Sequence, residues 1–260
     1  MTPFGDLTAA DLPLFLLALT RVSGMVFLAP VFGNPALPAK VKALLSLLLA
    51  LLFFPMLRGP VPSWDLGGLL LAAGGELAVG MAIGFAASLL FAGVHLAGQI
   101  VDQELGLQGA NLLDPLTSET VTIAGQLKMI LATLVFLLIN GHHFLLSAVG
   151  DSFRAVPPLA FSPSAGAALA LSDGLVGGLF RMAVQIAAPT LVTVFLVTVA
   201  IAFMARAVPE MNVFVMGFAL RLGAGLVVLA LGVGIFVSEF AERVVEHARN
   251  VTGVIGTLGP

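Results

Sequence analysis

Residues 66–101 set the fold class, and they read LGGLLLAAGGELAVGMAIGFAASLLFAGVHLAGQIV. Glu76 is the one Asp, Glu, Lys or Arg in this run. The apolar residues are continuous and do not alternate, which favours a membrane helix over a barrel strand. A bilayer core about 30 Å thick needs about 20 residues at helical rise, so the run is too long for one perpendicular span. Because its glycines permit a break or kink, we expect either two helices or one long tilted helix.

The rest of the chain has the same character. Of its 260 residues, 59% are hydrophobic and 10% are charged, and the formal net charge is -3. A soluble domain of this length needs more polar surface than that. The sequence therefore predicts an all-α, polytopic integral membrane protein that contacts membrane lipid, with residues 1–260 forming a single membrane domain.

About six apolar helical segments are expected, and polar stretches separate them. A polar, plug-like loop is expected over 102–120, a loop rich in Pro, Ser and Ala over 151–173, and a polar C-terminal tail over 239–260. The apolar segments fall at residues 12–32, 41–57, 66–101, 121–139, 175–204 and 213–237.

Several kinds of chemistry have no residues to support them. The chain has no cysteine, which excludes disulfides and thiolate catalysis. It contains no GxxxxGK[ST] phosphate loop, no GxSxG elbow and no HExxH zinc motif. Because basic residues are not clustered, a nucleic-acid partner is not expected. We therefore predict no catalytic residue, no cofactor and no metal site, and hence not an enzyme.

Four charged residues lie within or near apolar segments: Arg21, Glu76, Arg181 and Arg221. An ionisable group at the centre of a membrane helix costs roughly 2.5–3.5 kcal/mol, so these side chains must face protein, water or each other. They could form an ion pathway or buried pairs that fix helix assembly. A relay usually needs several titratable groups in series, and Glu76 is the only mid-segment carboxylate. We therefore favour assembly.

The histidines are weaker candidates. His142 and His143 are adjacent, so on a helix they point about 100° apart and cannot bind one metal as an i, i+4 pair does. A turn near the membrane surface explains them more simply. His95 stands alone in an apolar segment, and we expect it to hydrogen-bond to a neighbouring helix.

Small residues recur at a spacing of four in two places, Gly80-xxx-Gly84 and Gly174-xxx-Gly178. This spacing lets two membrane helices approach closely. It predicts tight helix packing, either within the chain or between chains.

Four short blocks, in this order, resemble the FliR family of flagellar and type III secretion systems, called SctT in the virulence machines. The resemblance covers nearly the whole chain. The blocks are Arg21 to Gly33 with Pro35, Pro38 and Lys42; Gly75-Glu76 with Gly80, Gly84-Phe85 and Ala97-Gly98-Gln99; Gly106 to Asp114-Pro115 with Asn140-Gly141-His142; and Ala205 to Phe214 with Gly217-Phe218.

The resemblance implies a subunit of the export gate in the bacterial inner membrane, at the core of the flagellar basal body. In that family the protein packs with homologues of FliP and FliQ into a helical assembly and contacts a homologue of FlhB. Unfolded flagellar proteins pass through the resulting pore. Within such an assembly we expect Arg21, Glu76, Arg206 and Arg221 to secure the packing.

The resemblance also implies a pore plug in residues 106–115. Family members often carry aromatic residues where this chain has glycine and leucine, so its leucines would have to form the seal together with a partner's methionines. The plug residues are Gly106, Leu107, Gly109, Leu112, Leu113, Asp114 and Pro115.

Two other hypotheses remain open. A secondary transporter of a small solute would use Glu76 as its coupling group, although such proteins commonly show two related halves and none is visible here. A membrane enzyme that uses His142 and His143 is a third, more distant hypothesis.

Overall fold

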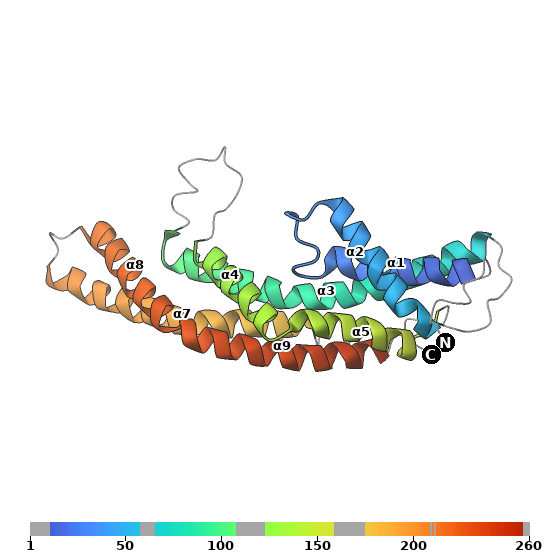
Figure 1. Cartoon of the computed structure of the whole chain (residues 1–260). Helices are drawn as coiled ribbons and strands as arrows, with labels where there is room; N and C mark the ends of the chain where they lie inside the picture. The colour runs from blue at the N-terminus through green and yellow to red at the C-terminus, as the bar shows by residue number, and fades with distance from the viewer. Residues whose placement is uncertain are drawn as a thin grey trace. The chain divides into compact units, whose positions relative to one another are not determined.

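The computed structural model describes residues 11–57, 66–107, 123–158, 175–208, 210 and 212–256. Within these ranges the regular elements are all helical (Figure 1). In chain order they are α1 (Leu12–Leu28), α2 (Ala39–Phe53), the 3-10 turn η2 (Phe54–Leu57), α3 (Leu66–Glu104), α4 (Ile123–Leu138), α5 (Gly141–Ala155), α7 (Gly177–Ala207), α8 (Val213–Leu231) and α9 (Val233–Gly256).

Three helical stretches in the described part of the chain are long and apolar enough to cross a membrane: Ala39–Leu57, Gly67–Glu104 and Gly177–Ala207. Two bent pairs, α4 with α5 and α8 with α9, raise the number of spans to as many as five. The prediction of an all-α polytopic membrane protein is confirmed.

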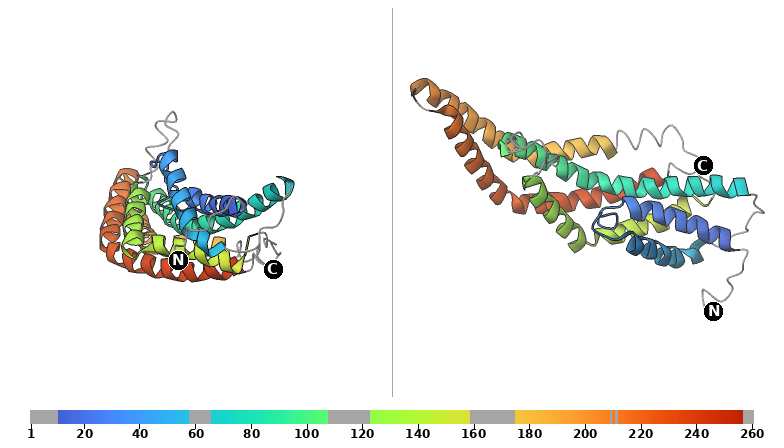
Figure 2. Two further views of the ribbon diagram at one scale, coloured as in Figure 1. Left: turned by 45° about the vertical axis from the view of Figure 1, so that its right-hand side comes forward. Right: turned by 90° about the horizontal axis from the view of Figure 1, so that it is seen from above.

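The long run at residues 66–101 is a single helix. Figure 2 shows α3 as one unbroken element from Leu66 to Glu104. Of the two arrangements that the sequence left open, the structure has the single long helix. Its glycines make room for neighbouring helices instead of breaking the chain, as the packing around Gly80 and Gly98 shows below.

The chain divides into two compact units, and the single membrane domain stays a prediction. Both α3 and α9 contribute to each unit. The first unit comprises residues 1–90, 140–176 and 244–260, and the second comprises 91–139 and 177–243.

In the first unit, α1 packs against α2 and η2. A proline in the first turn starts α1, where the missing N–H costs no hydrogen bond. The buried face of α1 recurs every three or four residues and includes Leu17, Met25 and Val22, each at most 1% exposed. Aromatic contacts complete this core: Phe15 meets Phe54, and Phe53 meets Phe153.

In the second unit, α7 and α8 form a hairpin, drawn in orange in Figure 2. Asn212 caps the start of α8 because its side-chain oxygen accepts the N–H of Val215 at 3.3 Å. The core joins α3, α4 and α7 through Val101, Leu105, Ala124, Ala187 and Val194. The same unit contains a row of phenylalanine contacts, formed by Phe91, Phe136, Phe236 and Phe240.

Some element boundaries differ from those expected. Helix α5 continues to Ala155, so the first residues of the predicted 151–173 loop are helical, while residues 159–174 lie outside the described part. Helix α9 extends to Gly256, so most of the predicted polar tail is helical as well. Helix α1 ends at Leu28, and Val31 has a φ of 70° in the turn that follows.

Candidate functional site

A buried ion pair joins the helices of the first unit. The Nε of Arg21 in α1 donates to Oε2 of Glu76 in α3 at 2.5 Å. Arg21 is 0% exposed and Glu76 is 1% exposed. The sequence analysis singled out both residues, and the structure brings them together.

Helix α5 completes the coordination of the same guanidinium. One terminal nitrogen of Arg21 donates to Oγ of Ser152 at 3.2 Å, and the other donates to the carbonyl oxygen of Val156 at 2.8 Å. The ring of Phe153 lies 4.3 Å from the guanidinium carbon. The Ser152 hydroxyl is itself oriented, because it donates to the carbonyl of Val149 at 2.7 Å. The guanidinium therefore connects α1, α3 and α5.

Glycines set the spacing around this ion pair. A Cβ on Gly80 of α3 would overlap the carbonyl oxygen of Arg21 in α1. A Cβ on Gly84 would lie 2.8 Å from the carbonyl oxygen of Met25. The Gly80-xxx-Gly84 spacing thus places α3 directly against the backbone of α1, and the predicted tight packing is confirmed within the chain. Gly178 has open space around it, and Gly174 lies outside the described residues.

A second polar site, which the sequence analysis did not single out, lies in the second unit. Asp102, near the end of α3, is 0% exposed. Its two carboxylate oxygens accept the backbone N–H groups of Ala124 at 3.0 Å and Gly125 at 3.4 Å. These amides lie in the first turn of α4, where no intrahelical acceptor exists. Asp102 therefore caps α4 from a different helix.

The helices at this cap also touch backbone to backbone. A Cβ on Gly98 would overlap the backbone of Gly125. The sequence holds one signal that could have revealed this contact. Asp102 follows Gly98 by one helical turn, and Gly125 lies in the first turn of a later helix.

The other cations assigned to assembly belong to the second unit. Arg181 and Arg206 are exposed on α7. Arg221 is half-buried on α8, and its Nε has no hydrogen-bond partner among the described residues. An assembly role for these three residues stays a prediction.

The described start of the predicted plug is Gly106 and Leu107. Gly106 has a φ of 77°, a conformation that glycine adopts without strain, and it faces the ring of Phe218 in α8. Leu107 packs against the core of the second unit. The remaining plug residues lie outside the described part of the chain: Gly109, Leu112, Leu113, Asp114 and Pro115.

The histidine predictions are settled in part. Asn140 has a left-handed φ of 58°, and α5 begins directly after it, so His142 and His143 follow a sharp turn. Their rings contact each other at 4.3 Å. In the described ranges no group of three potential metal ligands occurs. Nε2 of His95 lies 3.2 Å from Nε2 of Gln99 on its own helix, and the expected bond to a neighbouring helix is not seen among the described residues.

Long apolar helices that enclose a buried ion pair define the chain as a polytopic helical membrane protein. Comparison with known families specifies the class further. The profile of the family described as "Bacterial export proteins, family 1" matches residues 12–247. The chain belongs to this family, which is the FliR/SctT family that the four sequence blocks resemble.

Similar proteins span nearly the same length. The chain is 30% identical over 251 residues to the flagellar biosynthetic protein FliR of Bacillus subtilis, with 94% of this chain and 96% of the relative covered. It is 28% identical to FliR of Escherichia coli, with 92% and 91% covered. It is 30% identical to FliR of Caulobacter vibrioides, with 91% and 94% covered.

Proposed function

We propose that this chain is a subunit of the flagellar type III protein-export gate. In this proposal it assembles with homologues of FliP and FliQ, contacts a homologue of FlhB, and lines the pore through which unfolded flagellar proteins leave the cell. It works as a scaffold in the inner membrane, within the flagellar basal body, and catalyses no reaction.

The observation that carries the proposal is the end-to-end match to proteins named for flagellar biosynthesis, which covers 94% of this chain and 96% of the Bacillus subtilis relative. It favours a shared role for the whole membrane domain.

The structure supplies physical support. Arg21 and Glu76 satisfy each other inside the first unit, as expected of a packing element and not of a group that must bind and release ions. Large apolar side chains are exposed along α7 and α8, including Phe195, Phe203 and Leu226. Such faces suit contact with further apolar helices or with lipid.

Residues 106–115 are assigned to the pore plug as part of the same proposal. The support is limited to the root of the segment, where Gly106 turns the chain with a positive φ and Leu107 is anchored on the core. An anchored root next to a glycine turn gives the residues that follow a fixed starting point.

Gene deletion tests the proposal. Cells that lack this chain should have no flagellar filaments, should secrete no hook or filament protein, and should regain both when the wild-type gene is restored. The matched biochemical test is tagging of the chain, mild detergent extraction and identification of co-purifying proteins. Homologues of FliP and FliQ should be recovered with it.

Two results would contradict the proposal. Normal flagella after deletion of the gene would show that flagellar export does not need this chain. A tagged chain that runs alone and transports a small solute in reconstituted vesicles would identify a secondary transporter instead.

A further inference from the structure

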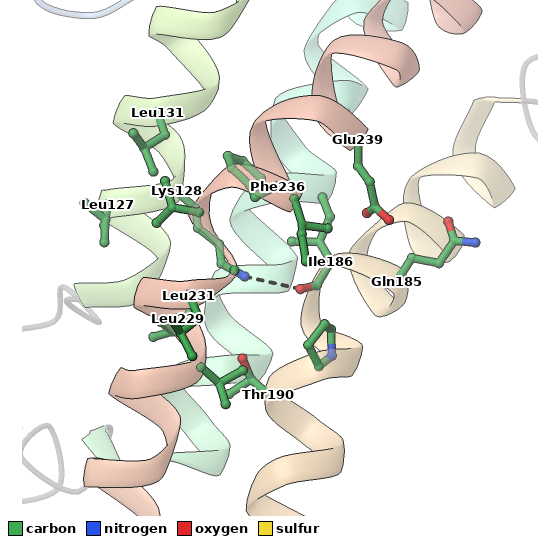
Figure 3. A pocket seen from close by; sticks show the side chains of 15 residues that line it. Leu127, Lys128, Leu131, Gln185, Ile186, Thr190, Leu229, Leu231, Phe236 and Glu239 are labelled. Carbon is green, nitrogen blue, oxygen red and sulfur yellow. Dashed lines mark hydrogen bonds between the residues drawn. The ribbon is translucent and has the colours of Figure 1, made fainter.

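A cavity of about 310 Å³ lies inside the second unit, between α4, α7, α8 and α9 (Figure 3). Two breaks in helical regularity border it. Pro189 lies within α7, and Gly232 separates α8 from α9, which meet at a 56° bend. Both residues line the cavity, so the points at which these two helical stretches are weakest border the same space.

Helix α7 lacks one backbone hydrogen bond at Pro189. Proline has no N–H group, so position 189 donates nothing to the carbonyl oxygen of Gln185 one turn earlier. The hydroxyl of Thr193 donates to the carbonyl oxygen of Pro189 at 2.9 Å, a type of side-chain bond that often bends helices. This turn of α7 therefore resists bending less than the rest of the helix.

Beyond these two points the chain forms a hairpin, residues 190–207 of α7 with residues 213–231 of α8, here called the arm. Its two helices pack on each other, and the Cβ position of Gly217 lies 3.7 Å from the side chain of Ile201. At 1.5 Å per residue, Phe203 lies about 21 Å along α7 from Pro189. A rotation of about 20° at Pro189 therefore displaces Phe203 by about 7 Å.

Lys128 of α4 contacts both helices beside the two breaks. It is 7% exposed, and its ammonium donates to the carbonyl oxygen of Ile186 in α7 at 3.4 Å, the dashed line in Figure 3. The same ammonium lies 6.0 Å from the centre of the Phe236 ring, in the first turn of α9. Its charge is balanced nearby, since Asp102 interacts with it electrostatically and Glu239 lines the same cavity. Lys128 therefore ties α7 and α9 to α4.

The arm also contacts the end of α3. A Cβ on Gly225 of α8 would meet the side chain of Leu105, and a Cβ on Gly106 would meet the ring of Phe218. Each contact pairs a glycine with one side chain. A side chain can change its rotamer or slide over a surface that bears no side chain. These contacts therefore allow the arm to move.

From this geometry we propose that Pro189 and Gly232 form a paired hinge, about which the arm swings toward α4 and closes the cavity. Lys128 is the latch that holds the arm in the open position of the structure. The cavity walls are largely apolar and include Leu131 and Leu229, so they offer water few partners. The arm gains packing contacts when the space closes, which makes the closed position accessible.

Distances between spin labels test the hinge, because the chain has no cysteine and labels attach to introduced ones alone. Leu134→Cys on α4 with Phe203→Cys on α7 reports the position of the arm against α4. Phe203→Cys with Leu226→Cys lies wholly within the arm, and all three positions are exposed. Double electron–electron resonance on the full chain in nanodiscs should show two distances for the first pair, which differ by about 5–7 Å, and one for the second.

Four variants, measured with the first label pair, separate the parts of the hinge. Pro189→Ala restores the N–H donor and should leave one distance. Val228→Phe fills the cavity and should lower the population at the shorter distance at least tenfold. Ile130→Phe is its matched control, because Ile130 is exposed on α4 and is not part of the cavity lining, and it should behave as wild type does. Lys128→Met removes the latch and should raise the shorter-distance population at least twofold.

A single distance for the first pair in the wild-type background overturns the proposal. So do two distances that stay unchanged in both Pro189→Ala and Val228→Phe. The inference goes beyond the proposed export function, and its outcome is independent of that function, because the distances are measured on the protein and not on secretion.

Discussion

Arg21 has its three guanidinium nitrogens hydrogen-bonded inside a site that is 0% exposed. A buried ion pair of this kind contributes little compared with an apolar replacement of both partners, but the removal of one partner leaves an uncompensated buried charge. The stability of the fold therefore depends on keeping both residues, because either charge alone would be buried without a partner.

We expect Glu76→Leu to destabilise the first unit by about 3–5 kcal/mol, because Arg21 would remain charged and buried without its carboxylate. The measurement is the temperature at which half of the detergent-solubilised protein leaves the monodisperse peak. Asp151→Asn is the control, since Asp151 pairs with Arg154 at 3.5 Å on the surface, where a pair contributes about 0–1 kcal/mol. Equal losses in the two variants would contradict the assignment.

Asp102 carries a second prediction at this scale. Asp102→Ala should expose the first-turn amides of α4 to exchange, since its carboxylate is their acceptor, and should cost about 1–3 kcal/mol. Hydrogen exchange of a peptide that contains Ala124 and Gly125 measures this. Glu104→Gln, at an exposed position on the same helix, should leave that exchange unchanged. Unaltered protection in Asp102→Ala would show that another group caps α4.

The sequence identified some of these residues and missed others for a physical reason. Arg21 and Glu76 stand out because each interrupts a long apolar run. Asp102 falls at the end of such a run, where the charge pattern of a solvent-exposed helix end and that of a buried cap are the same. Its partners are backbone amides, which every residue carries, so composition gives no sign of them.

At the scale of elements, the contact between α1 and α3 depends on glycines. Gly80→Ala should destabilise the pair by about 1–3 kcal/mol, because the new methyl group meets backbone that cannot rotate away. Gly74→Ala on the same helix is the matched control, since nothing lies within 4 Å of its Cβ position. That variant should gain about 0.5–1 kcal/mol of helix stability.

Thermal loss of the monodisperse peak again provides the readout for the two glycine variants. Opposite shifts are expected, with Gly80→Ala lower and Gly74→Ala higher than wild type. Shifts of the same sign would mean that helix propensity and not close contact governs both positions.

The type of each element followed from the sequence more easily than its ends. Continuous apolar runs predicted helices correctly, because a lipid environment leaves few other ways to satisfy the backbone. The extension of α5 to Ala155 was missed because the Pro, Ser and Ala content of residues 151–173 indicated a loop from its first residue. In the structure Asp151 and Arg154 form an i, i+3 pair on the helix surface.

In the whole molecule, the exposed apolar side chains of α7 must be covered by protein or by lipid, and substitution of one of them can distinguish the two. Phe203 is 68% exposed. If partner helices cover it, Phe203→Glu should reduce the partner recovered per inserted chain at least tenfold, because a buried charge would lie in the interface. Quantitative mass spectrometry of the affinity-purified complex gives this ratio.

Lys40→Glu, at an exposed position before the apolar part of α2, controls for the charge change and should leave the ratio unchanged. A lower amount of membrane-inserted Phe203→Glu with an unchanged partner ratio would assign that face to lipid. The two-unit arrangement itself could not be foreseen, since it depends on which residues of α3 and α9 contact which neighbours.

The 39 residues of α3 form a rod about 58 Å long at 1.5 Å per residue. A hydrocarbon layer about 30 Å thick accommodates about 39 Å of helix even at the 40° limit of observed inclination. About a dozen residues of this largely apolar helix must therefore extend beyond the hydrocarbon layer. Among the three unbent candidate spans of the described residues, α3 is also the most enclosed, with 61% of an 18-residue apolar stretch buried against 28% in each of the other two. Neighbouring helices of the same chain therefore cover much of α3 that lipid would otherwise contact.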